Sequence, residues 1–223
     1  LRKDTAIRVA APNVTISGFT ITDCRVAITI VNYAGEQYPS GCKIVNNNII
    51  NNSEGIRPRA NNVLISANNM SNCGTGISGY DVKSIVITGN NITENVYGIN
   101  IGQSNYITVA ENNISNNEGG LNMIYYGQYS VHGNNFTKNS WAIRFAEGCR
   151  NASVYGNNIS ENGIAVWLLT FPVGGEMAIS GEGNTFFGNL LIGNNQQIST
   201  HEIQYANINI TGNKGTDKVA WDN

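Results

Sequence analysis

The sequence predicts an all-β fold, a single-stranded right-handed parallel β-helix. Three observations point to it: a repeat of about 22 residues, paired apolar positions in each repeat, and columns of asparagine. Successive repeats are anchored on one large apolar residue, and the anchors are spaced 28, 21, 22, 22, 22, 23 and 27 residues apart. The anchors are Ile21, Ile49, Met70, Ile92, Ile114, Phe136, Ile159 and, more weakly, Phe186. A fixed period of this length is typical of a solenoid with one supersecondary unit per repeat.

Each repeat carries two apolar-x-apolar pairs, one before the anchor and one after it, as Ile85/Ile87 and Ile99/Ile101 do around Ile92. This alternation is typical of strands with one buried face, and no stretch shows helical spacing. With the anchor strand, each unit has three short strands. About eight coils stacked about 4.8 Å apart would form a rod roughly 40 Å long. A propeller blade needs about 40 residues, so the period excludes a propeller. Right-handedness follows from the rule for parallel crossovers.

A column of small residues lies six positions after the anchor, and we expect it at a tight corner where a larger side chain would collide with the next coil. The column is Ala27, Gly55, Gly76, Gly98, Gly120 and Ala142.

Three asparagine columns flank the anchors. Two of them immediately precede the anchor, as Asn90 and Asn91 precede Ile92, and the third follows it by three residues, as Asn95 does. In the third column, Cys24 and Cys73 replace asparagine. Asparagine tolerates left-handed backbone and can form hydrogen-bonded ladders between stacked units. We therefore predict that these columns are structural and lie at the corners of the coils.

The column directly before the anchor also forms Asn-x-Ser/Thr sequons, at Asn69, Asn91, Asn113, Asn135 and Asn158. In an exported protein these are candidate glycosylation sites. The repeat alone would also generate them, and the two interpretations are compatible.

Composition fits one β-helix domain over residues 1–223, with inserts near residues 32–41 and 168–176. Charged residues are only 13% of the chain, and the net charge of −2 gives no basic stripe for nucleic acid. No apolar run is long enough to span a membrane. The chain starts at Leu1 in the rhythm of the repeat and has no capping segment. We therefore expect a fragment or mature piece of a larger exported protein, or rods that join end to end.

Four cysteines are present. Cys24 and Cys73 would lie two coils apart, about 9–10 Å, which is beyond disulfide reach. Buried free thiols are therefore expected, with Cys149 at an exposed corner and a Cys24–Cys42 disulfide as the alternative. No CxxC pair occurs and the only histidines are His132 and His201, so we assign no metal and no cofactor.

The segments "APNVTISGFTITDC", "NNVLISANNMSNCGTGI" and "GNNITENVYGINI" resemble the parallel β-helix repeats (PbH1 type) of the pectin-lyase-like superfamily. More closely they resemble its NosD-like branch, which includes a periplasmic copper-maturation protein and many archaeal cell-surface proteins. The resemblance covers nearly the whole chain. It implies export to the cell envelope or the extracellular space, with adhesion or polysaccharide-associated roles, including enzymes that cleave surface polysaccharide. The fold alone transfers no chemistry.

No catalytic residues can be assigned from the sequence. Glycoside hydrolysis usually needs two carboxylates about 5–10 Å apart. The column two residues after the anchor contains Asp23, Glu94 and Glu161, but never in adjacent coils. Glu111 and Glu118 fall at different corners of one coil.

One predicted surface combines aromatic, arginine and asparagine side chains, which suit stacking on sugar rings and bidentate bonds to their hydroxyls or carboxylates. Its members are Arg57, Arg59, Tyr80, Tyr97, Asn122, Tyr125, Trp141, Arg144 and Trp167. A protein contact or ordinary surface would also accommodate them. We therefore expect a non-catalytic scaffolding, assembly or adhesion module that binds polysaccharide through this face. A polysaccharide-degrading enzyme and a copper-maturation protein are the alternatives.

Overall fold

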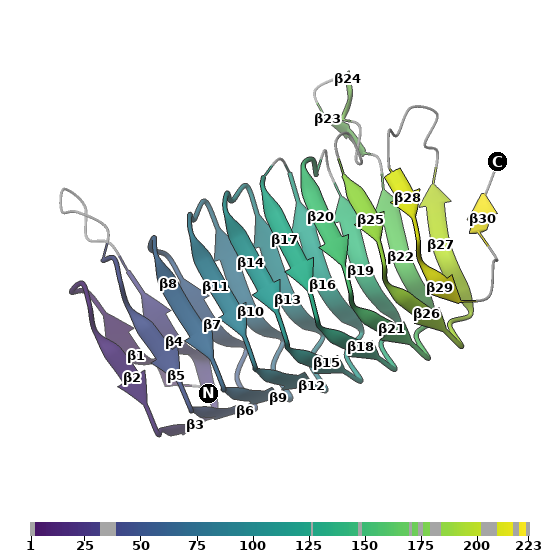
Figure 1. The fold of residues 1–223 in the computed structure, drawn as a ribbon. Coiled ribbons are helices and arrows are strands. Elements are labelled where there is room, and N and C mark those ends of the chain that lie inside the picture. The colour runs from purple at the N-terminus through teal and green to yellow at the C-terminus, as the bar shows by residue number, and fades with distance from the viewer. Residues whose placement is uncertain are drawn as a thin grey trace.

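The computed structural model describes residues 3–31, 39–125, 127–146, 149–169, 171–173, 176–178, 184–201, 209–215 and 219–221. Within these residues every regular element is a strand, and no helix is present that could cross a membrane. The chain winds through three parallel sheets that run the length of a rod (Figure 1). The prediction of a right-handed parallel β-helix of about eight coils is confirmed.

The three sheets, here called A, B and C, follow one another in each coil in the order B, C, A. Sheet A contains β1 (Lys3–Val9), β4 (Cys24–Ile30), β7 (Glu54–Pro58), β10 (Thr75–Tyr80), β13 (Tyr97–Gly102), β16 (Gly119–Ile124), β19 (Trp141–Ala146), β22 (Ile164–Leu169), β27 (Gln196–His201) and β30 (Val219–Trp221). Sheet B contains β2 (Thr15–Ser17), β5 (Lys43–Val45), β8 (Val63–Ser66), β11 (Ile85–Thr88), β14 (Ile107–Ala110), β17 (Tyr129–His132), β20 (Ala152–Tyr155), β25 (Thr185–Phe187) and β28 (Asn209–Thr211). Sheet C contains β3 (Thr20–Thr22), β6 (Asn48–Ile50), β9 (Asn69–Ser71), β12 (Asn91–Thr93), β15 (Asn113–Ser115), β18 (Asn135–Thr137), β21 (Asn158–Ser160), β26 (Leu190–Ile192) and β29 (Lys214–Gly215).

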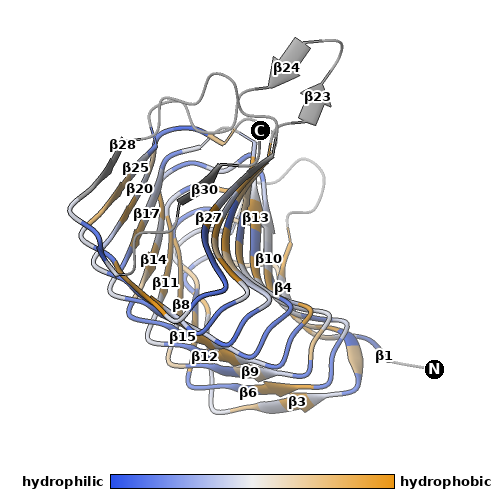
Figure 2. Ribbon diagram, turned by 90° about the vertical axis from the view of Figure 1, so that its right-hand side faces the viewer, coloured by the Kyte–Doolittle hydropathy of each residue, from blue (hydrophilic) through white to orange (hydrophobic). Residues whose placement is uncertain are grey.

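The apolar pairs and the anchors face the interior of the rod, as the sequence predicts. Ile85, Ile87, Ile92, Ile99 and Ile101 from one coil are all fully buried. Figure 2 shows the three sheets enclosing this common interior. Because equivalent residues pair in register from coil to coil, each apolar column stacks on itself and buries what one coil alone would expose.

Single residues in left-handed backbone make the two short corners of each coil. At the corner between sheets B and C, Ala67, Gly89 and Glu111 have φ of 54°, 64° and 57°. At the corner between sheets C and A, Asn72 and Glu94 have φ of 54° and 57°. Each of these residues directly precedes a member of a buried Asn or Cys column. The ladder asparagines themselves do not take the left-handed backbone: the preceding residue makes the turn, and the asparagine satisfies the polar groups that the turn exposes.

The buried asparagine ladders are confirmed at both corners. The Oδ1 atom of Asn90 accepts hydrogen bonds from the backbone N–H of Asn68 and from its Nδ2, both at 3.0 Å. The same geometry links Asn95 to Asn117 at the other corner. Cys24 and Cys73 occupy the second ladder as predicted, and their backbone N–H groups donate to Asn52 and Asn95.

The small-residue column lies within the strands of sheet A rather than at a corner, where the sequence placed it. Its physical reason is nevertheless the predicted one. A Cβ added at Gly55 or Gly98 would lie 2.4 or 2.7 Å from the carbonyl oxygen of the next coil. The strands of sheet A bend along their length (Figure 2), and register pairing skips this column.

All four cysteines are free and buried. The alternative of a Cys24–Cys42 disulfide is therefore wrong. The expectation that Cys149 is exposed is also wrong, because its side chain is 0% exposed. Its backbone is fixed by hydrogen bonds to Ala146 and Asn184, which turn the thiol into the core beside Tyr129.

The two predicted inserts differ in what can be described. Most of the insert near residues 32–41 lies outside the described residues. The insert near residues 168–176 includes an antiparallel pair, β23 (Phe171–Val173) and β24 (Glu176–Ala178), between β22 and the next coil (Figure 1).

Candidate functional site

The outer side of sheet A, here called the sheet A face, collects the residues that the sequence predicts for recognition. Register places one outward column on adjacent strands, running Ser78, Asn100, Asn122, Arg144 and Trp167. The residues at the start of the same strands form a second column that includes Tyr97 and Trp141. The β-helix thus brings together side chains that lie up to about 90 residues apart in the sequence.

The centre of the face is a tryptophan cluster made of Tyr97, Asn122, Trp141, Arg144 and Trp167. The Trp141 ring centre lies 5.9 Å from that of Tyr97 and 6.4 Å from that of Trp167. The Arg144 guanidinium lies 4.9 Å from the centre of the Trp141 ring and 5.7 Å from that of Trp167. Its Nε donates to Asn122 Oδ1 at 2.7 Å, so the arginine is held in place against both indoles.

The cluster has a covered layer and an accessible layer. Trp141 is 6% exposed because it lies flat over Gly119, where an added Cβ would come within 2.0 Å of the indole. Asn122 is 1% exposed beneath Arg144 and donates through Nδ2 to Asn100. Tyr97, Arg144 and Trp167 are half-buried and form the surface that a ligand would meet.

A pair of tyrosines lies beside the cluster. The rings of Tyr80 and Tyr125 meet edge to face, with centroids 6.4 Å apart. Gly102 lies beneath the Tyr80 ring, where a Cβ would be 3.2 Å from Cδ2, and the Tyr80 hydroxyl donates to Gln103. Tyr80 remains 58% exposed, so it offers an accessible ring next to the cluster.

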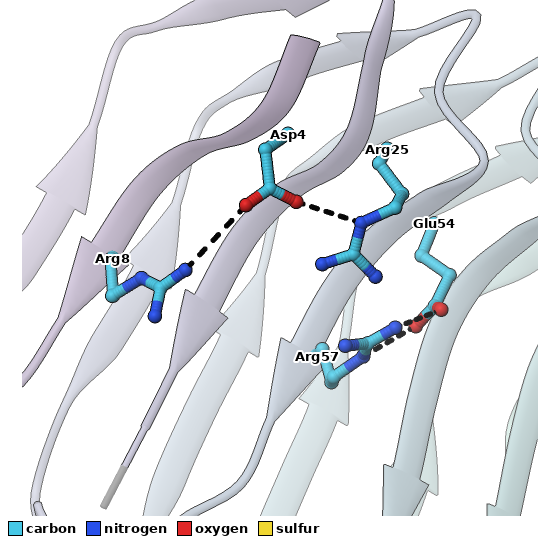
Figure 3. A network of polar contacts seen from close by, with 5 residues as sticks. All are labelled: Asp4, Arg8, Arg25, Glu54 and Arg57. Carbon is cyan, nitrogen blue, oxygen red and sulfur yellow. Dashed lines mark hydrogen bonds and ion pairs between the residues drawn. The ribbon is translucent and has the colours of Figure 1, made fainter. Parts of the chain in front are cut away.

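Charged residues occupy the end of the face nearest the N-terminus (Figure 3). Asp4 accepts from Arg25 Nε at 2.8 Å and lies 4.0 Å from Arg8, while Glu54 forms a bidentate pair with Arg57. Of these five residues the repeat pattern singled out only Arg57. Asp4 and Arg8 lie in the first strand, which no anchor precedes to set its register. In the repeats anchored on residues 70 to 159, no arginine occupies the position of Arg25 and no carboxylate that of Glu54. Each carboxylate in this network is already paired with an arginine, which is a structural arrangement rather than a poised acid or base.

Arg59, the remaining predicted member, is exposed just beyond β7. The nine predicted residues thus fall into five cluster members, the Tyr80–Tyr125 pair, one arginine in the charged network, and Arg59.

The sequon asparagines form a third ladder, on the outer side of sheet C. Asn91 Nδ2 donates to Asn69 Oδ1 at 2.7 Å, Asn113 Nδ2 to Asn91 at 2.8 Å, and Asn135 Nδ2 to Asn113 at 2.9 Å. Asn158 continues the ladder toward the C-terminus. The Nδ2 atom that would carry a glycan is therefore also the donor of the ladder.

The fold and this face define a right-handed parallel β-helix whose outer side carries an arginine and aromatic surface. The chain belongs to the family described as periplasmic copper-binding protein (NosD), whose model matches residues 13–218. A search of curated proteins finds no match.

Three solved structures illustrate the likeness of the fold. The complex of XylC with xylose matches with a TM-score of 0.53 and 13% identity, over 82% of this chain and 42% of that one. The catalytic unit of a GH87 α-1,3-glucanase from Streptomyces thermodiastaticus matches with a TM-score of 0.65 and 16% identity, over 95% of this chain and 50% of that one. The A-module of the mannuronan C-5 epimerase AlgE4 from Azotobacter vinelandii gives 0.55 and 14%, over 98% and 78%. The chain thus spans half or less of the first two proteins, and at these identities the likeness shows the fold alone.

The family description names copper binding, which requires side chains that can bind a copper ion. The described residues hold no group of three or more His, Cys, Asp or Glu side chains that could bind a metal ion. Met70 and Met123 are fully buried in the core, and His132 is stacked against Tyr155. Copper favours converging imidazole, thiolate and thioether ligands. The described residues do not fit that pattern, and no chemistry through copper is derived for them.

Proposed function

We propose that this chain is a non-catalytic module of an exported protein, located in the periplasm or outside the cell, that binds polysaccharide through the sheet A face. The observation that carries the proposal is the tryptophan cluster, in which Arg144 is held against Trp141 and Trp167 by its bond to Asn122. A rigid arrangement of this kind loses little side-chain entropy on binding, which favours affinity.

The charge of the face favours an acidic polysaccharide. Within the described strands of sheet A, four arginines outnumber the two carboxylates Asp4 and Glu54, whereas the whole chain has a net charge of −2. The arginines are Arg8, Arg25, Arg57 and Arg144, while Arg59 and Asp81 lie just beyond β7 and β10. Guanidinium groups bind carboxylates in a bidentate manner, and aromatic rings stack on sugar rings. Uronic-acid polymers supply both the carboxylates for the arginines and the sugar rings for the aromatic side chains.

The proposal is tested by titrating the chain with polygalacturonate and with neutral dextran, using calorimetry. We expect polygalacturonate to bind, and Arg144→Ala or Trp167→Ala to weaken binding about tenfold, from the loss of one charge-assisted or stacking contact. Ser78→Ala, in the same outward column, is the matched control and should bind as the parent chain does. Unchanged binding in Arg144→Ala and Trp167→Ala would contradict the proposal, as would the absence of binding by the parent chain.

One observation favours a second candidate, an enzyme that cleaves polysaccharide. Glu94 and Glu118, in adjacent coils, line one open hollow of about 570 Å³ at the corner between sheets C and A, together with Asn72 and Asn116. Asn72 Nδ2 donates to Glu94 at 3.2 Å. Release of reducing sugar or unsaturated product from a polysaccharide, abolished by Glu94→Gln or Glu118→Gln, would favour the enzyme over the binding module.

A further inference from the structure

We propose that the outer side of sheet B carries a second, separate binding site, which takes a short neutral oligosaccharide. The site is an open hollow of about 710 Å³ across β14, β17 and β20, here called the sheet B hollow. These strands lie side by side in the middle of sheet B (Figure 1). The sheet B hollow shares no residue with the sheet A face.

The floor of the hollow is a row of hydroxyl groups. Thr108, Ser130 and Ser153 are register partners on the three adjacent strands, so their side chains repeat about every 4.8 Å along the rod. Ser153 also accepts a hydrogen bond from Thr185 at 3.2 Å, which orients its hydroxyl. A row of hydroxyls at a regular spacing can donate to and accept from the hydroxyls of a sugar.

One side of the hollow is Tyr106, in an unusual conformation. It has φ of 58°, at a corner where other coils have Asn62, Ser84 or Asn151 in the same left-handed backbone. Asparagine fits that position at little cost, whereas a bulky aromatic residue there is a genuine outlier. The Tyr106 ring is 64% exposed, so burial in the core does not account for its presence. An exposed aromatic side chain on strained backbone is a feature of binding sites.

The opposite side is Tyr155, which neighbouring rings hold in place. His132 stacks on one side of it with centroids 5.0 Å apart, and Phe187 on the other side at 5.1 Å. Asn151 is the residue in the coil of Tyr155 that corresponds to Tyr106. Tyr155 lies four residues after Asn151, and its coil is the second one after that of Tyr106. These offsets correspond to about 13 Å along the strand and about 10 Å along the rod, so the two residues lie about 16 Å apart, a span that suits a short oligosaccharide rather than one sugar unit.

The residues that line the sheet B hollow are all uncharged. An ionic ligand would therefore find no partner in it, whereas a neutral sugar would find the exposed Tyr106 ring at one side, the edge of the Tyr155 ring at the other, and hydroxyls between them. The sheet A face differs in this respect, because the Arg144 guanidinium lies against the rings of Trp141 and Trp167. The two faces are therefore suited to different sugars.

The test titrates the full chain with cellotetraose, xylotetraose and mannotetraose, and with tetragalacturonate as the acidic comparison. We expect at least one neutral tetrasaccharide to bind, and Tyr106→Asn to weaken that binding about tenfold. Because asparagine is native at this corner in other coils, Tyr106→Asn should fold at least as well as the parent chain, which separates lost binding from lost structure. Arg144→Ala, on the sheet A face, should leave the affinity for the neutral tetrasaccharide unchanged.

Three results would overturn the proposal. The parent chain would bind none of the neutral tetrasaccharides, Tyr106→Asn would bind them as the parent does, or Arg144→Ala would abolish the neutral binding. The last result would place the neutral sugar on the sheet A face. Failure of tetragalacturonate to bind bears only on the sheet A face and leaves this proposal intact.

Discussion

The Oδ1 atom of Asn112 accepts two hydrogen bonds from Asn90 in the preceding coil, one from the backbone N–H at 3.0 Å and one from Nδ2 at 2.9 Å. Asn112 Nδ2 in turn donates to the carbonyls of Ile87 and Ala110, both at 2.9 Å. The side chain is 1% exposed. One buried amide therefore satisfies polar groups of Asn90 and Ile87 in the preceding coil and the carbonyl of Ala110 in its own coil.

We predict that Asn112→Ala lowers the free energy of unfolding by about 2–4 kcal/mol, because it leaves several buried donors and acceptors without partners. Asn113→Ala, one residue away in the solvent-exposed outer ladder, should cost less than about 1 kcal/mol. Urea denaturation of the two variants measures the difference. Equal effects would mean that water replaces the inner ladder as readily as the outer one.

Cys73 interrupts the second buried ladder between Asn52 and Asn95, and its thiol lies 3.4 Å from the carbonyl oxygen of Ser71. We predict that Cys73→Asn stabilises the protein by about 1–2 kcal/mol, because an amide oxygen here would accept from Asn52 as its equivalents accept elsewhere. Thermal unfolding provides the measurement. Cys24→Asn, at the start of the column, should gain less, and a lower melting temperature for Cys73→Asn would contradict the ladder account.

Gly98 and Gly89 belong to the same coil but have opposite requirements. A Cβ at Gly98 would lie 2.7 Å from the carbonyl oxygen of Gly120, whereas Gly89 has φ of 64° and open space around it. We predict that Gly98→Ala costs about 1–3 kcal/mol through overpacking. Gly89→Asn should change stability by less than about 0.5 kcal/mol, because asparagine tolerates left-handed backbone. Chemical denaturation distinguishes them, and a neutral Gly98→Ala would show that the strands can move apart.

Burial raises the pKa of the Cys149 thiol and the pKa of the Tyr129 phenol above their ordinary values of 9.0 and 10.0. The unfolded chain therefore loses these protons at lower pH than the folded chain. We predict that the stability contributed by these groups is fully present below about pH 9 and falls as the pH rises above it. Urea unfolding at pH 8, 9, 10 and 11 measures the slope.

Two variants test whether Cys149 and Tyr129 cause the loss of stability at alkaline pH. Cys149→Ala and Tyr129→Phe should each reduce the loss of stability at alkaline pH, whereas Tyr106→Phe at the surface should not. Among the described residues the Tyr129 hydroxyl is also buried without a well-aligned hydrogen-bond partner, although the backbone of Ser104 lies close to it, so Tyr129→Phe should be close to neutral at pH 7. A large loss at pH 7 would instead show that the hydroxyl forms a useful hydrogen bond.

The repeat is what made the fold predictable from the sequence. Because stacked coils pair in register, aligning the repeats places Asn90 and Asn112 in one column of neighbouring coils. The hydrogen-bonded ladders follow from that alignment. The register also placed Asn122, Arg144 and Trp167 on adjacent strands. Features outside the repeat were not predictable. One of them is the ion pair of Arg25 with Asp4, because Asp4 lies in the first strand, which no anchor precedes.

Side-chain directions along the rod were also beyond sequence reasoning. Trp141 lies over Gly119 of the preceding coil, and Cys149 turns inward from a corner. Both depend on space left by a neighbouring coil rather than on the type of residue at the position itself. The sheet B hollow was not predictable for a related reason: Tyr106 is unusual only because its column has left-handed backbone, which the sequence does not display.

The most direct test of polysaccharide binding by the sheet A face is hydroxyl-radical footprinting of the chain with and without saturating polygalacturonate, read residue by residue by mass spectrometry. We predict that the polymer protects Trp167, Tyr80 and Tyr125 from oxidation, while the exposed rings of Phe19 and Tyr106 react as before. Protection of Phe19 or Tyr106 without protection of Trp167 would contradict it, and so would polymer binding that leaves every aromatic residue of the sheet A face unprotected.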